Sequence, residues 1–243
     1  MTGRKKVLIT GAAGRIGRTL RNAFVGVYDL RLLYHSKVLP KEGDDEVVVG
    51  DLCDFDAMVE AVKGVDVVVH MAGIPGERAF EQLWTVNIQG TYHIFEAARQ
   101  CGVNQIVFAS TNHVTGFYEK DGVYVTPEMP VRPDSLYGVS KAFGEALGRY
   151  YVDQYGMSVH CLRIGSFVPE NRPRSVRALS TWMSHPDMAR LVQRCIEAED
   201  VKFGIFYGIS DNTRKYWDIA NARELVGYDP EDDAETYAGE IEA

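Results

Sequence analysis

The sequence contains few cysteines and no spacing of them that is typical of a metal or redox site. Its four cysteines are scattered along the chain, at Cys53, Cys101, Cys161 and Cys195. None of them forms a C-x-x-C pair, and His35, His70 and His185 are not spaced as metal ligands either. Isolated thiols are typical of a reducing compartment. We therefore expect a cytoplasmic protein without a metal site.

Long hydrophobic runs and clusters of basic residues are also missing. The apolar stretch that follows the basic start of the chain, VLIT, is too short for a secretory signal or a membrane span. Acidic residues outnumber basic ones by 34 to 26, and binding to a phosphate backbone needs clustered Lys and Arg. We therefore expect a small-molecule partner rather than nucleic acid or a membrane.

The 243 residues are enough for one large core, and their pattern is that of an α/β protein. Short Val- and Ile-rich runs alternate with amphipathic segments, as in a parallel sheet with helices on both faces. Strands are expected at 6–10, 28–33, 46–50, 65–70, 105–109 and 158–164. Helices are expected at 15–24, 55–62, 79–100 and 137–155. The runs VLIT, VDVVVH and QIVFAS are apolar throughout, which predicts strands buried on both faces of a doubly wound parallel sheet.

The regular alternation ends after Ile164, and this change suggests a division of the chain. We expect a Rossmann core over 1–165 and a small substrate-binding region over 166–243 that is not an independent domain. A helix is expected to start at Ser184 and Pro186. The tail YDPEDDAETYAGEIEA is expected to be a solvated acidic end.

The segment TGAAGRIG follows the first expected strand and has the glycine spacing of a dinucleotide site. Gly11, Gly14 and Gly17 would let a pyrophosphate approach the backbone at the start of the next helix. NAD-binding proteins usually place an acidic residue at the end of the second strand, where this chain has LLYHSK. Without that carboxylate, and with His35 and Lys37 nearby, the choice between NAD and NADP stays open.

In the segment SLYGVSKAFGE, Tyr137 and Lys141 are four residues apart and share one face of the expected helix. Val139, Phe143 and Leu147 form an apolar stripe on the other side, so the polar pair need not lie among core side chains. A nearby ammonium, together with the positive charge of an oxidised nicotinamide, favours the phenolate and lowers the pKa of the phenol. Tyr137 is therefore a candidate base.

Several segments together resemble the extended short-chain dehydrogenase/reductase family over nearly the whole chain. These are GDLCD, HMAG, VNIQGT, FASTNHVTG and YGVSK, in the order and spacing of that family. Four segments look like its uronate dehydrogenase branch, which oxidises the anomeric carbon of hexuronic acids with NAD: FASTNHVTGFY, RPDSLYGVSKAFGE, LRIGS and RALSTWMSH.

The resemblance implies a role for each matching residue. The catalytic residues would be Thr111, Tyr137 and Lys141. The cofactor would contact Gly11, Gly14, Arg15, Ile16, Gly17, Tyr34, His35, Ser36, Asp51, Leu52, Ala72, Gly73, Asn87, Tyr137, Lys141 and Ile164. The substrate would contact Pro75, Thr111, Asn112, His113, Ser166 and Arg177. Thr111 stands where the family usually has Ser, and Pro75 stands where the uronate dehydrogenase branch usually has a substrate-binding Ser.

Some alternatives remain open at this stage. Asn87 is either a catalytic residue or a side chain that bridges neighbouring elements. Arg177 is expected to hold a substrate carboxylate, although with Arg172 and Arg174 it could equally recognise a phosphate. The resemblance implies a homo-oligomer that oxidises a sugar acid at C1. A glucose 6-phosphate dehydrogenase, a nucleotide-sugar epimerase or dehydratase, and a non-catalytic NAD(P) sensor are the alternatives.

Overall fold

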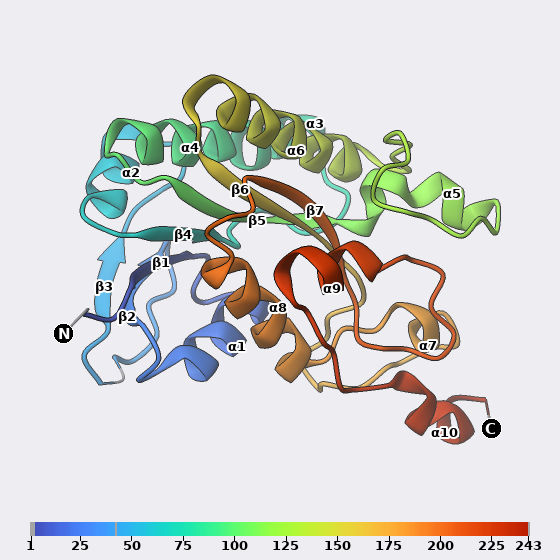
Figure 1. Cartoon of the computed structure of the whole chain (residues 1–243). Coiled ribbons are helices and arrows are strands. Elements are labelled where there is room, and N and C mark those ends of the chain that lie inside the picture. Colours follow the sequence, from blue (N-terminus) through green and yellow to red (C-terminus); the bar gives the residue numbers. More distant parts are fainter. Residues whose placement is uncertain (1–2, 42, 243) are drawn as a thin grey trace.

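The structure, a computed structural model, describes residues 3–41 and 43–242. These residues form one seven-stranded sheet in the order β3-β2-β1-β4-β5-β6-β7, with every neighbouring pair parallel (Figure 1). The strands are β1 (Lys6–Thr10), β2 (Asp29–Tyr34), β3 (Glu46–Val49), β4 (Val67–His70), β5 (Gln105–Thr111), β6 (Ser158–Ile164) and β7 (Phe203–Gly208). Because all strands run the same way, their carboxyl ends lie at one edge of the sheet.

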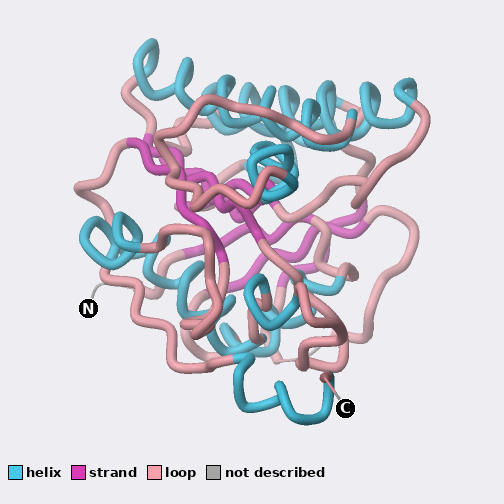
Figure 2. Tube along the Cα trace, turned by 90° about the vertical axis from the view of Figure 1, so that its right-hand side faces the viewer, coloured by secondary structure: helices cyan, strands magenta, loops and turns pink. Residues whose placement is uncertain are grey.

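Helices cover both faces of the sheet (Figure 2). One face carries α2 (Phe55–Val62), α4 (Gly90–Gln100) and α6 (Leu136–Tyr155), and the other carries α1 (Arg15–Phe24), α8 (His185–Glu197) and α9 (Ala220–Val226). Adjacent strand residues alternate between the two cores: Val67 and Val69 pack in one, Val68 in the other. The predicted doubly wound sheet with strands buried on both faces is confirmed.

Several elements differ from those expected, among them β7 and the helix expected at 79–100; the helix α9 and several helices of four or five residues were not predicted either. The strand β7 was not predicted, because Gly204 and Gly208 interrupt its apolar residues and glycine is depleted in strands. The helix expected at 79–100 is three consecutive pieces: α3 (Phe80–Leu83), a π-helical segment η1 (Trp84–Gln89) and α4. The helix expected from Ser184 is present as α8, and the Ser184 hydroxyl accepts from the backbone of Asp187.

The prediction that the C-terminal tail is solvated is wrong. Tyr228 and Ala234 are fully buried. The carboxylate of Asp187 accepts from the backbone nitrogens of Glu231 and Asp232, at 3.0 and 3.1 Å. The tail continues as η3 (Ala234–Tyr237) and α10 (Ala238–Ile241), which pack on α7 (Ala178–Thr181). The small and aromatic residues that stand between the acidic ones make this contact. A count of charged residues alone does not indicate it.

The buried face of α6 also differs from the prediction. Val139, at the start of the expected apolar stripe, is 43% exposed, whereas Lys141 is 4% exposed. The face against the sheet consists instead of small and charged residues: Gly138, Ser140, Lys141, Gly144, Glu145 and Gly148. A Cβ atom on Gly144 would lie 2.3 Å from the Phe108 ring. Glycines thus let the helix approach the sheet closely enough to bury Lys141.

No helix in residues 3–41 and 43–242 is long and apolar enough to cross a membrane.

Substitution of Gly144 by Ala tests this close approach. The added methyl group must displace α6 or the Phe108 ring, and such overpacking typically costs about 1–3 kcal/mol. We therefore expect Gly144→Ala to lower the free energy of unfolding by that amount in urea titrations. Gly239→Ala is the control, because a Cβ at that exposed position meets open space. Equal stability of the two variants would contradict the close packing.

Candidate active site

The turn between β1 and α1 is tightly packed and shaped for an anionic ligand. Gly11 has φ +67°, and a Cβ on it would lie 2.8 Å from the Ala72 backbone. A Cβ on Gly17 would lie 2.3 Å from the Gly11 oxygen. Gly14 precedes α1 without a side chain that caps the helix. The first backbone N–H groups of α1 are thus left to a ligand, and this is the arrangement in which a helix N-terminus holds phosphates.

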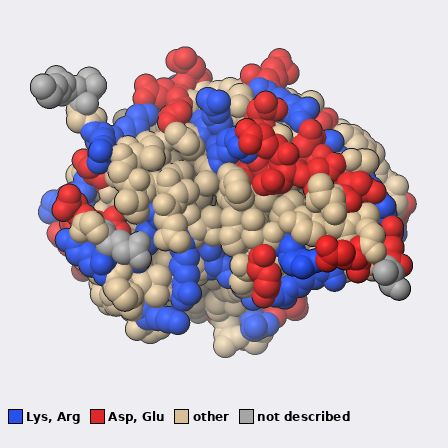
Figure 3. All heavy atoms as spheres, turned by 90° about the horizontal axis from the view of Figure 1, so that it is seen from below, with Lys and Arg blue, Asp and Glu red and all other residues tan. Residues whose placement is uncertain are grey.

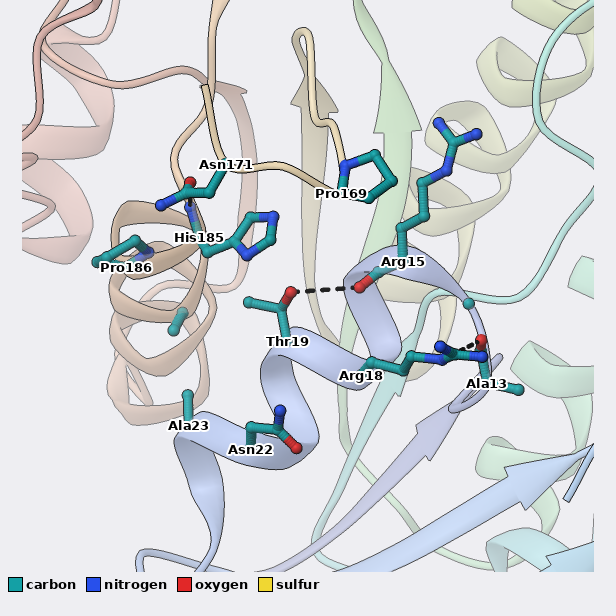
Figure 4. A pocket seen from close by; sticks show the side chains of 12 residues that line it. Ala13, Arg15, Arg18, Thr19, Asn22, Ala23, Pro169, Asn171, His185 and Pro186 are labelled. Carbon is teal, nitrogen blue, oxygen red and sulfur yellow. Dashed lines mark hydrogen bonds between the residues drawn. The ribbon is translucent and has the colours of Figure 1, made fainter. Parts of the chain in front are cut away.

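A cleft of about 860 Å³ opens beside this turn, between α1 and α8 (Figure 4). Its walls include the predicted cofactor residues Gly14 and Arg15. The prediction missed other lining residues, among them Arg18, Pro169, Asn171 and His185. Arg18 lies one turn after Gly14, so the glycine spacing could have indicated it. Pro169, Asn171 and His185 are far from the turn in the sequence, and only the tertiary structure brings them to the cleft.

The ends of β2 and β3 gather the residues expected around an adenosine. Tyr34 ends β2 and is buried, while His35 is exposed. The His35 Nε2 lies 3.6 Å from a carboxylate oxygen of Asp51, which follows β3. A hydrogen bond from the Cys53 backbone, with a smaller contribution from His35, lowers the pKa of Asp51. The carboxylate of Asp51 therefore places a negative charge beside the end of β2, although β2 itself does not end in an acidic residue.

Asn87 of η1 joins the loop after β4 to α6. Its Oδ1 accepts from the Ile74 nitrogen at 2.8 Å, and its Nδ2 donates to the Ile74 oxygen and to Ser140. A Cβ on Gly73 would lie 3.1 Å from the Asn87 Oδ1 and 3.3 Å from the Lys141 Nζ. The amide is thus occupied by bonds that bridge three segments. A direct catalytic role for Asn87 stays a prediction.

Thr111, Tyr137 and Lys141 come together where β5 ends and α6 begins. Thr111 is the last residue of β5, and its side chain is hydrogen-bonded to the Tyr137 phenol. Lys141 lies one turn along α6 from Tyr137, with Nζ 4.9 Å from the centre of the Phe108 ring. The loop after β4 also reaches this helix start, because Glu77 accepts from the Tyr137 backbone at 3.0 Å.

Burial dominates the electrostatics of this group. It lowers the pKa of Lys141 from 10.5 to about 8. It also raises the pKa of Tyr137, more than the hydrogen bond with Thr111 lowers it. In the protein alone, desolvation penalises the phenolate, so the pKa of the phenol is not lowered. The expectation of a lowered pKa includes the charge of an oxidised nicotinamide and stays a prediction.

Of the other residues expected at the substrate, His113 lies beside the phenol. The His113 ring stands 5.9 Å from that of Tyr137 and bonds Asp134 at 2.8 Å. Asn112 donates to the Ile164 oxygen at 3.0 Å, while its buried Oδ1 has no partner among the described residues. Pro75 lies in the exposed loop after β4.

The three arginines of the 166–177 segment do not form a phosphate cluster. Each is paired with a different carboxylate: Arg172 with Glu240, Arg174 with Glu170 and Arg177 with Glu119. Arg177 also donates to Ser166 at 3.3 Å. On the face that Figure 3 shows, the described Lys and Arg side chains are interspersed with Asp and Glu. The hypothesis that all three recognise one phosphate is not supported by this arrangement.

Comparison with known proteins identifies the family. The sequence matches the model of the NAD dependent epimerase/dehydratase family over residues 7–198. The chain belongs to this family. It is 42% identical to the uronate dehydrogenase of Pseudomonas syringae pv. tomato over 240 residues, 98% of this chain and 86% of that protein. It is 40% identical to the NAD-dependent glucose-6-phosphate dehydrogenase of Haloferax volcanii over 259 residues, 97% of each.

A solved structure supports the same relationship. A mutant of uronate dehydrogenase from Agrobacterium tumefaciens, complexed with NAD, superposes with a TM-score of 0.92 at 40% identity. The match covers 98% of this chain and 89% of that one. The family assignment made from sequence motifs is therefore confirmed.

The buried ammonium of this family member should destabilise the fold. Below pH 8, Lys141 is protonated in both the folded and the unfolded state, and a pKa lowered from 10.5 to about 8 corresponds to a cost of about 3 kcal/mol. We expect Lys141→Met to be more stable than the wild type at pH 7 by up to that amount in urea unfolding, although inactive.

The pH dependence of this gain provides the control. Between pH 8 and about 10.5, unfolded Lys141 retains a proton that the folded protein has lost, so wild-type stability rises relative to the variant. The advantage of Lys141→Met should therefore shrink between pH 7 and pH 10. Lys215→Met, which removes a lysine paired with Asp211, should show no such gain. An advantage that grows with pH would contradict the burial cost.

Proposed function

We propose that the chain is an NAD-dependent dehydrogenase that oxidises a hexuronate or a related aldose at C1 to the lactone. The observation that carries this proposal is the juxtaposition of Thr111, Tyr137 and Lys141 at the sheet edge that also bears the glycine-rich turn. A hydroxyl beside a phenol, with an ammonium one helical turn away, can bind and deprotonate a sugar hydroxyl. The close similarity to uronate dehydrogenases supports the substrate class.

The cofactor would lie along the carboxyl ends of the strands. The pyrophosphate would rest on the turn of Gly11, Gly14, Arg15, Ile16 and Gly17, whose close packing fits a ligand held by backbone. The other cofactor contacts we propose are Tyr34, His35, Ser36, Asp51, Leu52, Ala72, Gly73, Asn87, Tyr137, Lys141 and Ile164. The chemistry that NAD supplies when bound is the acceptance of a hydride from C1.

Side chains of the protein would transfer the proton of the C1 hydroxyl. Tyr137 would take the proton of the C1 hydroxyl, and Thr111 would orient that hydroxyl and the phenol. The form of Tyr137 that accepts this proton is the phenolate, which becomes a phenol in the step. Lys141, with a pKa of about 8, keeps its charge at neutral pH and would stabilise that phenolate before the proton is transferred. Burial excludes water from this step and strengthens the charge interactions.

The sugar would contact residues that follow β4, β5 and β6. Asn112 offers a buried carbonyl oxygen with no partner among the described residues. We propose Pro75, Thr111, Asn112, His113, Ser166 and Arg177 as its contacts. A phosphate at the distal end is less favoured, because the loop arginines are each paired with a separate carboxylate.

We also propose a cytoplasmic homo-oligomer. Exposed apolar side chains on neighbouring elements support the association: Phe80, Trp84, Leu136 and Val139. The four cysteines, all free thiols, fit a reducing compartment.

The base is tested by Tyr137→Phe, which removes the phenol oxygen and keeps the ring. Turnover of the preferred sugar should fall by at least ~10²–10⁴-fold, as expected for loss of a general base, while NAD binding persists. Tyr150→Phe, an exposed position of the same helix, serves as the control and should retain activity. Near-normal turnover by Tyr137→Phe would remove this residue from the mechanism.

Cofactor choice provides a second test. We expect NADP to be used measurably but less well than NAD, because the Asp51 carboxylate beside His35 repels a 2′-phosphate. Asp51→Asn should raise the kcat/KM for NADP relative to that for NAD by roughly tenfold. Asp56→Asn, an exposed change in the first turn of α2, should leave the ratio unchanged. An unchanged ratio in Asp51→Asn would show that another group selects the cofactor.

A further inference from the structure

Arg177 already has a carboxylate partner within the protein. Glu119, in the short helix α5 (Gly116–Lys120), accepts from both the Nε and the Nη2 of Arg177, the latter at 2.8 Å. The side chain of Glu119 is 20% exposed and that of Arg177 is 44% exposed. Tyr216 also hydrogen-bonds Glu119. The two residues are 58 positions apart in the chain, so only the fold brings them together.

This ion pair changes what Arg177 can offer a substrate. The bond with Glu119 is the main cause that raises the pKa of Arg177, so the guanidinium stays charged and paired. The Nε and Nη2 side of the fork is occupied, and Nη1 donates to Ser166 at 3.3 Å. Together the two side chains carry no net charge. A carboxylate that approached Arg177 would also meet the negative charge of Glu119.

An uncharged sugar terminus meets a different surface. A hydroxyl group can donate to a carboxylate and accept from a guanidinium, so it matches a neutral pair that presents both groups. A carboxylate can only accept. The pair therefore reduces the advantage that an isolated arginine would give to an anionic sugar.

We propose that Glu119 is a specificity-determining residue. As the internal counter-ion of Arg177, it weakens selection for an anionic distal group and lets the site accept aldoses whose distal end is uncharged. This inference rests on the proposed C1 dehydrogenase function and on Arg177 lying at the distal end of the sugar.

The test compares charged with neutral sugars in the full-length enzyme. The kcat/KM values for glucuronate and galacturonate are measured against those for glucose and galactose, with saturating NAD. Glu119→Gln keeps the size of the side chain and its acceptor for Tyr216 but removes the charge. We expect it to raise the ratio of uronate to neutral-sugar kcat/KM by about tenfold, mainly through a lower KM for uronates, with an unchanged KM for NAD.

Two further variants separate charge from structure. Glu119→Lys adds a positive charge and should raise the ratio further than Glu119→Gln. If Glu119 only holds Arg177 in place, Glu119→Lys should instead lose more activity toward uronates than Glu119→Gln. Glu240→Gln removes the carboxylate partner of Arg172 and should leave the ratio at the wild-type value. Folding of each variant is checked by its NAD affinity.

A ratio that is unchanged or lower in Glu119→Gln would overturn the proposal, because Glu119 would then have no part in selection or would only hold Arg177 in place. Failure of the proposed function looks different. In that case the wild type would bind NAD and oxidise none of the four sugars.

Discussion

The close approach of α6 to the sheet is the constraint on which the active site depends. Gly144 and Gly148 leave no room for a side chain between the helix and the residues of β5 and β6. The same approach buries Lys141 and Glu145. Glu145 is compensated by Arg163 of β6, at 2.9 Å, so its charge is paired within the interior. Lys141 has no such counter-ion among its described contacts, and its lowered pKa follows from that difference.

The buried ion pair of Glu145 and Arg163, between α6 and the sheet, also sets the position of the reacting groups. Glu145 accepts from Ser110 at 2.6 Å, and Ser110 directly precedes Thr111 in β5. Removing either charge of the buried pair would leave the other uncompensated, which is strongly unfavourable. The helix is therefore held in one position relative to β5. The contact between Thr111 and Tyr137 is a consequence of this arrangement.

A second polar network fixes the segment that follows β4. Thr10 accepts from the backbone of Ala72 at 3.1 Å, and its hydroxyl lies 2.8 Å from the Nδ1 of His70. Complete burial lowers the pKa of His70 to about 3, so this imidazole stays neutral at physiological pH. The backbone of Ala72 and Gly73, which we place against the cofactor, is thus fixed by side chains that need not change protonation during a reaction.

The sequence by itself determined the α/β class, the glycine-rich turn, the position of Tyr137 and Lys141 one turn apart on a helix, and the family. These features depend on residues close together in the chain, where periodicity and short motifs carry the information. Tertiary structure alone decided that α6 buries its charged face, that the acidic tail packs on α7, and that Glu119 neutralises Arg177. Each of these depends on partners far apart in the sequence, because burial and counter-ions exist only after the strands and helices have assembled.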